Sequence, residues 1–186
     1  MYDTIVIGLG GMGSATAWHL ARCGQRVLGL EQYLFDHDRG SSHGESRIIR
    51  HAYFEHPDYV PLLKRSYAYW NQLDGETGRE IITLCGMFMA GRADDTVISG
   101  TRRAAAEHGL PLEQVAPSDA LERFPNLRAE PGMDILFDPL GGYLCVENCV
   151  AAHLDGARVA GATLRQNEEV LSWKAEGGGV RVTTVK

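Results

Sequence analysis

The chain has 186 residues, of which 44% are hydrophobic and 23% are charged, a balance typical of a globular rather than a disordered protein. Its net charge of -6 argues against nucleic acid or an anionic membrane as a main partner. No apolar run reaches the roughly 18 residues that span a bilayer, and Asp3 without a basic leader makes a poor signal peptide, so we expect a cytoplasmic protein.

The N-terminal region predicts a strand, a helix and a second strand in succession. The short, continuous β-branched run at residues 3–8 is typical of a fully buried parallel strand. Residues 11–23 predict a helix that ends at Gly24, and residues 25–31 predict a second buried strand that ends in Glu31. These elements make a βαβ unit, for which a right-handed crossover is expected.

The rest of the chain predicts a mixture of helices, short strands and one long loop at residues 32–56. Further helices are predicted at residues 58–73, 96–109, 118–125 (with Ser118 as its N-terminal cap) and 147–160. Further strands are predicted at residues 80–91 (one bent strand or two short ones), 111–115, 134–147 (a hairpin or strand pair around residues 139–142) and 162–185 (three pieces with a glycine turn).

The cysteines point to no particular chemistry. Cys145 and Cys149 are four residues apart, a spacing that would suit a pair of metal ligands on a helix. Free thiols in a reducing compartment are the simpler interpretation, because no CxxC spacing is present. We therefore expect no metal site.

A glycine loop follows the first predicted strand, with Gly8, Gly10 and Gly13 in the G-x-G-x-x-G register. Gly8 would permit a tight turn, Gly10 would let the backbone approach a pyrophosphate, and Gly13 would let the helix pack close to the strand. The free amides at the helix N-terminus suit phosphates. Glu31 could accept hydrogen bonds from both ribose hydroxyls, which disfavours the 2′-phosphate of NADP but leaves FAD and NAD both open.

A second unusual segment is the basic loop at residues 40–53. Arg47 and Arg50 are three residues apart, so they would share a face if the loop formed a helical turn. Two cations near a dinucleotide can stabilise an anionic reduced flavin or hold a substrate carboxylate. His43 and His51 could adjust the charge near neutral pH. A solvated basic loop that only touches a cofactor phosphate is the alternative.

Residues 3–31 followed by residues 40–70 resemble the monomeric sarcosine oxidase and N-methyl-L-tryptophan oxidase family of flavin-dependent amine oxidases. The family's run G-S-x-H-G-[DE]-[ST]-R-x-I-R-H-A-Y is matched almost throughout at residues 40–53, and residues 141–149 are also similar. Ser42 stands where the family has a histidine, and Glu45 where it has an aspartate. The similarity covers essentially the whole chain.

The resemblance implies an α/β fold: a glutathione-reductase-type (Rossmann-like) FAD-binding domain with an interleaved α+β substrate domain, here truncated. Residues 1–80 and 146–186 would belong to the FAD-binding domain, and residues 81–145 to part of the substrate-binding domain. Because family members are considerably longer, we expect an N-terminal fragment that is not active alone.

The resemblance also assigns roles to individual residues. FAD would be the cofactor, and the cysteine that links covalently to it would lie beyond residue 186. Arg47 would sit over the isoalloxazine ring, His43 would lie near the flavin and the substrate amine as a second catalytic residue, and Arg50 would bind the substrate carboxylate. The other cofactor-binding residues that it implies are Gly8, Gly10, Gly11, Met12, Gly13, Glu31, Gln32, Ser41, Ser42 and Val170.

The activity implied is the oxidation by O2 of a secondary amine, in a small N-methyl or cyclic amino acid such as sarcosine or N-methyl-L-tryptophan, to an imine and H2O2. The complete protein would be a monomer. Two alternatives stay open at this stage. The first is an FAD-dependent amino-acid dehydrogenase or glycine oxidase of the same superfamily, and the second is a non-catalytic dinucleotide-binding or NAD-binding module.

Overall fold

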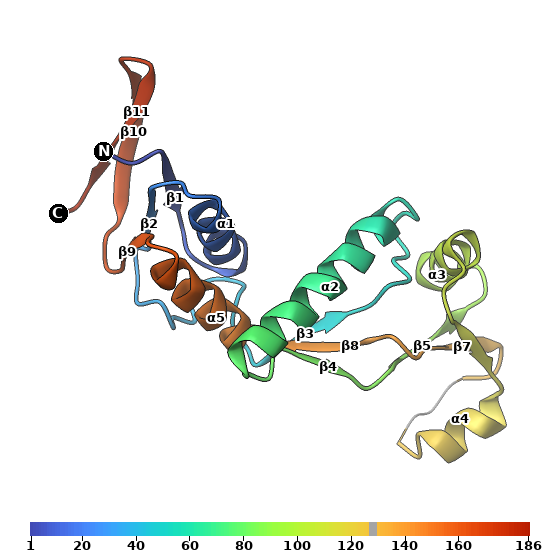
Figure 1. Ribbon diagram of the computed structural model, residues 1–186. Coiled ribbons are helices and arrows are strands. Elements are labelled where there is room, and N and C mark those ends of the chain that lie inside the picture. The colour runs from blue at the N-terminus through green and yellow to red at the C-terminus, as the bar shows by residue number, and fades with distance from the viewer. Residues whose placement is uncertain (127–129) are drawn as a thin grey trace. The chain divides into compact units, whose positions relative to one another are not determined.

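The structure is a computed structural model that describes residues 1–126 and 130–186 (Figure 1). The chain divides into two compact units, one made of Met1–Ser46 with Cys145–Lys186 and the other of Arg47–Leu144. The assignment of residues 81–145 to a substrate-binding domain stays a prediction. Within the described ranges, no helix combines the length and the apolar character that crossing a bilayer would require.

The first unit is built on a parallel three-stranded sheet with the strand order β1-β2-β9. Its elements are β1 (Thr4–Ile7), α1 (Gly11–Arg22), β2 (Val27–Leu30), α5 (Val146–Val159), β9 (Thr163–Arg165), β10 (Val170–Glu176) and β11 (Gly179–Thr184). The predicted βαβ unit is confirmed, and Gly24 follows α1 with a φ of 82°. That left-handed conformation is one that glycine adopts without steric cost.

Strands β1 and β2 differ in burial, although both are mainly apolar. β2 lies between its two neighbours and is buried throughout, as predicted. The prediction that β1 is fully buried is wrong, because β1 is only partly buried and Ile7 is 53% exposed. The physical reason is its position: among the described residues, β1 pairs with β2 on one side and with no strand on the other.

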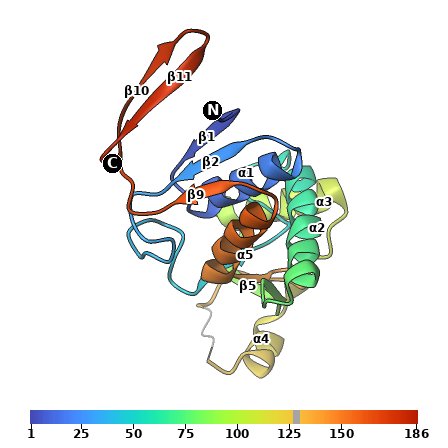
Figure 2. The same ribbon diagram turned by 60° about the vertical axis from the view of Figure 1, so that its left-hand side comes forward.

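Helices α1 and α5 pack against each other and cover one face of the sheet (Figure 2). Gly156 of α5 makes this packing close, since a Cβ at this position would lie 2.5 Å from Nε1 of Trp18. The ring of His153 lies beside that of Trp18, with 5.4 Å between centroids. His153 is 4% exposed, and burial lowers its pKa to about 4. The interface therefore holds a neutral imidazole.

The predicted glycine turn near the C-terminus is confirmed. Strands β10 and β11 form an antiparallel hairpin, and Gly177 and Gly178 at its tip have φ values of 58° and 79°. Two consecutive residues with positive φ are the requirement of a two-residue turn whose twist matches that of the flanking strands.

The second unit contains two three-stranded sheets, with strand orders β3-β8-β4 and β5-β7-β6. Its elements are β3 (Ser46–Ile49), α2 (Tyr59–Thr77), β4 (Ile82–Leu84), β5 (Met87–Arg92), α3 (Thr96–His108), β6 (Glu113–Val115), α4 (Pro117–Arg123), β7 (Met133–Asp138) and β8 (Gly142–Cys145). Strand β3 lies inside the segment predicted to be all loop. The α4 helix and the β5-β7-β6 sheet share a small core of Val115, Ala120 and Ile135.

The two strands predicted at residues 134–147 are present as β7 and β8, but the predicted hairpin is wrong, because the two strands belong to different sheets. Strand β7 pairs with β5, and β8 pairs with β4, both in antiparallel fashion. The consecutive strands β7 and β8 therefore run back along the consecutive strands β5 and β4. Gly141 and Gly142 allow the neighbouring chain to pack closely, rather than allowing the chain to reverse. A Cβ on Gly141 would lie 2.4 Å from Cβ of Met87, and one on Gly142 would lie 2.0 Å from the carbonyl oxygen of Thr83.

The start of α4 also differs from prediction. Ser118 is not its cap, since the helix begins at Pro117 and the capping position is Ala116. Proline is favoured at the first helical position, where its missing N–H costs no hydrogen bond and its φ already suits a helix. The hydroxyl of Ser118 instead donates to Oδ1 of Asp119 at 2.9 Å.

Candidate functional site

A cavity of about 770 Å³ lies in the first unit, where the glycine loop leads from β1 into α1. It is lined by every cofactor-binding residue predicted from the sequence except Arg47. These residues are Gly8, Gly10, Gly11, Met12, Gly13, Glu31, Gln32, Ser41, Ser42 and Val170. The structure therefore brings together residues that are up to 162 positions apart, from Gly8 to Val170.

The glycine loop has the conformation that the spacing predicted. Gly8 has a φ of 83°, which favours glycine, and its amide donates to the carbonyl of Leu30 at 2.8 Å. A Cβ on Gly13 would lie 1.8 Å from the carbonyl oxygen of Gly8. Glycine at position 13 is thus what allows the first turn of α1 to touch the loop that precedes it.

The N-terminus of α1 lines the cavity. Its N-cap is Gly10, which has no side chain to pair with the free amides, and its first turn holds no acidic residue. The hydroxyl of Ser42 accepts a hydrogen bond from the amide of Gly11 at 2.9 Å. The partial positive charge of a helix N-terminus favours an anion, so this part of the cavity is suited to phosphate.

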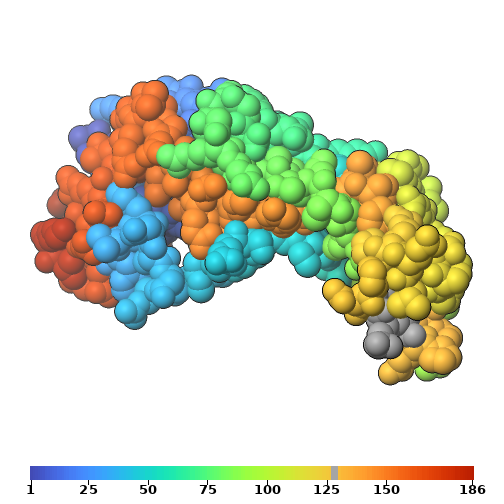
Figure 3. All heavy atoms as spheres, turned by 90° about the horizontal axis from the view of Figure 1, so that it is seen from below, coloured from blue at the N-terminus to red at the C-terminus, as the bar shows by residue number. Residues whose placement is uncertain are grey.

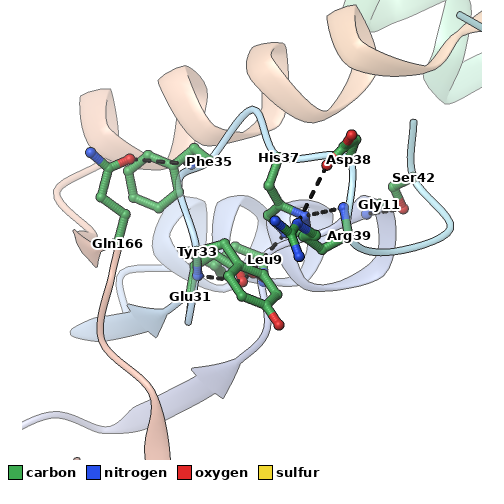
Figure 4. Close-up of polar contacts among 10 residues, drawn as sticks. All are labelled: Leu9, Gly11, Glu31, Tyr33, Phe35, His37, Asp38, Arg39, Ser42 and Gln166. Atoms are coloured by element: carbon green, nitrogen blue, oxygen red, sulfur yellow. Dashed lines mark hydrogen bonds and ion pairs between the residues drawn. The ribbon is translucent and has the colours of Figure 1, made fainter. Parts of the chain in front are cut away.

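Glu31 lies beside Leu9 of the glycine loop (Figure 4). It is 4% exposed. Its Oε2 accepts a hydrogen bond from the amide of Leu9 at 2.8 Å, and its Oε1 accepts one from the amide of Tyr33 at 3.2 Å. Nε2 of His37 lies 3.4 Å from Oε1. The carboxylate therefore ties the glycine loop to the segment after β2, a structural role that the sequence analysis missed.

The segment after β2 is joined to the chain that follows β9. The amide of Phe35 donates to Oε1 of Gln166 at 3.2 Å, and the amide of Asn167 donates to the carbonyl of Tyr33 at 2.9 Å. In the space-filling view the two segments are the light-blue and the adjoining red-orange atoms (Figure 3). This junction brings Val170 to the cavity, although no local pattern in the sequence signals it.

Several residues of the cavity were missed by the sequence analysis. Those with polar side chains are Thr16, Tyr33, His37, Arg39, Glu168 and Glu169. Nδ1 of His37 accepts a hydrogen bond from the amide of Arg39 at 3.0 Å, and the guanidinium of Arg39 lies 3.6 Å from Oδ1 of Asp38. The residues of this set that follow β2 and β9 could have been predicted from their position in the chain, because ligands of open α/β sheets bind beyond the carboxyl ends of the strands.

His43 is half-buried and is not among the residues that line the cavity. It begins a tight turn in which Gly44 and Glu45 both have positive φ. Oε1 of Glu147, in the first turn of α5, accepts hydrogen bonds from the amides of Gly44 and Glu45 at 2.8 and 3.2 Å. No local pattern in the sequence predicts this contact.

The expectation that Arg47 and Arg50 share the face of a helical turn is wrong. Arg47 lies in strand β3 and Arg50 directly follows it, and side chains three apart in an extended segment point to opposite faces. Arg50 lies over the rings of Tyr53 and Phe54, at 4.6 and 5.1 Å from their centroids. Both arginines belong to the second unit, and their roles toward cofactor and substrate stay predictions.

His51 packs inside the second unit. Its ring stacks on Tyr67 with centroids 3.7 Å apart, and burial lowers its pKa, while the nearby charge of Asp138 acts in the opposite direction. The hydroxyl of Tyr67 donates to the carbonyl of Leu140 at 2.8 Å. A neutral, stacked imidazole is a packing residue, so the structure gives His51 no part in the cavity of the first unit.

The chain is similar to a protein family, to characterised proteins and to solved structures. The family described as DAO, FAD dependent oxidoreductase, matches residues 3–186. The monomeric sarcosine oxidase of Streptomyces avermitilis is 47% identical over 185 residues, which are 100% of this chain and 48% of that protein. An N-methyl-L-tryptophan oxidase of Yersinia pestis is 34% identical over 99% of this chain and 50% of its own length.

Solved structures agree on the fold. NikD, an unusual amino acid oxidase essential for nikkomycin biosynthesis, superposes with a TM-score of 0.89 at 32% identity, over 99% of this chain and 48% of its own. Glycine oxidase from Geobacillus kaustophilus, at 24% identity and a TM-score of 0.82, shares the fold over 99% of this chain and 51% of its own. The predicted α/β fold class is thereby confirmed. This chain spans about half the length of the curated relatives that it matches, and with its family match over residues 3–186 it belongs to the DAO family of FAD-dependent oxidoreductases.

Proposed function

We propose that the chain binds FAD in the cavity of the first unit and forms part of an oxidase that acts on the secondary amine of a small amino acid. The products would be an imine and H2O2. The observation that carries this proposal is the cavity itself, which gathers the glycine loop, the N-terminus of α1, Glu31 and Val170 at one place. The 47% identity to a monomeric sarcosine oxidase favours an N-methyl amino acid as the substrate.

The residues of the cavity fit an adenine dinucleotide. The backbone at Gly10, Gly11 and Met12 would hold the diphosphate, because amides at a helix N-terminus bind anions. Glu31 would accept hydrogen bonds from the ribose, since a carboxylate has about four lone-pair positions and the described residues occupy them with two backbone amides and a 3.4 Å contact from His37. The backbone near Val170 would contact the adenine.

When bound, FAD would accept a hydride equivalent from the carbon next to the amine nitrogen and pass two electrons to O2. The protein would supply orientation and charge. His43 would lie near the amine, and Arg47 would supply positive charge beside the flavin ring.

Arg50 would hold the substrate carboxylate. Its Nε is buried and has no hydrogen-bond partner among the residues that the structure describes, and its Nη2 lies 3.5 Å from Oε1 of Glu55, a long contact. A buried donor without a partner costs free energy that a bound carboxylate would recover. The planar guanidinium can bind a carboxylate through two parallel hydrogen bonds, which lysine cannot reproduce.

Cofactor binding tests the first part of the proposal. The chain is titrated with FAD and, separately, with NADH, and each complex is passed through gel filtration. Flavin absorbance that stays with the protein supports the proposal, whereas binding of NADH alone supports a nicotinamide-binding module.

Activity is tested with a version of the chain extended at its C-terminus to the length of the relatives. Sarcosine, N-methyl-L-tryptophan and proline are supplied in turn, with O2 and H2O2 both measured. Amine-dependent reduction of an artificial acceptor without O2 consumption would indicate a dehydrogenase instead. In the active protein, Arg50→Lys should raise KM and Arg47→Lys should slow flavin reduction. Equal and small effects of both would contradict these roles.

A further inference from the structure

We propose that Glu147 is a positioning residue that holds the turn at residues 43–45 and thereby fixes the backbone that carries His43. The inference rests on the proposed function only in that it gives His43 a role beside the substrate amine. The turn and the start of α5 both belong to the first unit.

The turn and the start of α5 are joined by hydrogen bonds in both directions. Oε1 of Glu147 accepts from the amides of Gly44 and Glu45, at 2.8 and 3.2 Å, and the carbonyl of Glu45 accepts from the amide of Val146 at 3.1 Å. These partners are about 100 residues apart in the chain, so the contact is purely tertiary. One carboxylate oxygen thus organises two consecutive amides.

The turn needs such support because its backbone conformation is unfavourable. Gly44 has a φ of 92° and Glu45 a φ of 65°, and the amide of Ser46 folds back onto the carbonyl of Gly44 at 2.7 Å. Glycine tolerates positive φ, but a glutamate does so only when surrounding contacts offset the strain. Successive amides in such a turn form a concavity that binds anions, and here the anion is the carboxylate of Glu147.

Electrostatics favour the ionised form of Glu147. The pKa of its carboxyl is lowered chiefly by hydrogen bonds from its own amide and from the amides of Glu45 and Gly44, and further by the charge of His43. Its place in the first turn of α5 adds the favourable field of the helix N-terminus. At neutral pH the carboxylate is therefore charged, and a charge-assisted hydrogen bond is stronger than a neutral one.

The position of the turn explains why its rigidity matters. Ser42, directly before it, accepts a hydrogen bond from the amide of Gly11 at the start of α1, and β3, directly after it, carries Arg47. Fixing residues 43–45 to α5 therefore restrains His43 between the glycine loop and the strand that follows. Without Glu147, the strained backbone would relax and the imidazole of His43 would lose its orientation.

Three variants of the 186-residue chain test the proposal at neutral pH by NMR. Glu147→Ala removes both the charge and the acceptor, whereas Glu147→Gln removes the charge and keeps an acceptor oxygen. Asp155→Ala is the matched control, since it removes a carboxylate from the same helix, where Asp155 pairs with Arg158 at 2.8 Å. Amide hydrogen exchange and the ring resonances of His43 are recorded for each.

In Glu147→Ala, we expect the amides of Gly44 and Glu45 to exchange at least about tenfold faster. The ring resonances of His43 should move toward those of a free histidine. Glu147→Gln should restore most of the exchange protection but shift both amide protons upfield, because a neutral acceptor polarises them less. Asp155→Ala should match the wild type in exchange rates, in the amide proton shifts of Gly44 and Glu45, and in the ring resonances of His43.

Wild-type exchange rates and an unchanged His43 ring in Glu147→Ala would overturn the proposal, as would a Gln variant that behaves like the Ala variant. An FAD titration of the wild-type chain, run in parallel, keeps the two proposals apart. Failure to bind FAD would refute the proposed function. The exchange rates and the His43 resonances would still decide the role of Glu147.

Discussion

Replacing Gly13 with alanine places a methyl group where α1 and the glycine loop already touch. The new Cβ would lie 1.8 Å from the carbonyl oxygen of Gly8 and 3.4 Å from Cγ1 of Val6. Because the obstructing atom belongs to the backbone, helix and loop must separate by more than an ångström. Forcing extra volume into such a contact costs about 1–3 kcal/mol, and the higher helix propensity of alanine recovers only about 0.5–1 kcal/mol.

The same separation would move the α1 N-terminus away from a bound diphosphate, so FAD affinity should fall together with stability. Urea unfolding measures the first effect and FAD titration the second. The matched control is Gly75→Ala in α2, where a Cβ meets nothing within 4 Å and should stabilise the chain by about 0.5–1 kcal/mol. Unchanged unfolding and unchanged FAD affinity in Gly13→Ala would refute the reasoning.

Two other predictions address buried groups of the first unit. Glu31→Ala leaves the amides of Leu9 and Tyr33 without their acceptor, so it should cost about 1–3 kcal/mol in urea unfolding and weaken FAD binding, whereas Glu31→Gln should retain much of the stability. His153 has a pKa of about 4 in the folded chain against 6.5 for an ordinary histidine, so protons favour the unfolded state. The stability that the neutral His153 contributes is fully present above pH 6.5. It is lost as the pH falls toward 4, where the free energy of unfolding decreases by at most about 1.4 kcal/mol per pH unit. His153→Leu should reduce this slope in urea midpoints measured between pH 7.5 and pH 5 without abolishing it, because burial lowers the pKa of His51 as well; an undiminished slope would assign it to other groups.

Elements specified by local chemistry were predicted well. The βαβ start, the helix stop at Gly24 and the Gly177-Gly178 turn all follow from conformational preferences of a few neighbouring residues. The hairpin at residues 134–147 was predicted wrongly because its glycines carry two possible meanings. Glycine permits chain reversal and also permits close packing, and at Gly142 only the position of β4 decides between them.

By itself, the sequence determined the glycine loop, the acid at the end of β2 and the likeness to flavin-dependent amine oxidases, since these depend on residue type and short spacing. Tertiary structure alone decided that Glu31 would hold the amide of Leu9, that Ser42 would meet Gly11, and that Glu147 would hold the turn after His43. Each of these contacts joins residues more than twenty positions apart. Such contacts form only when the packing of α1, α5 and the sheet brings their backbones within hydrogen-bonding distance, and no local preference encodes that distance.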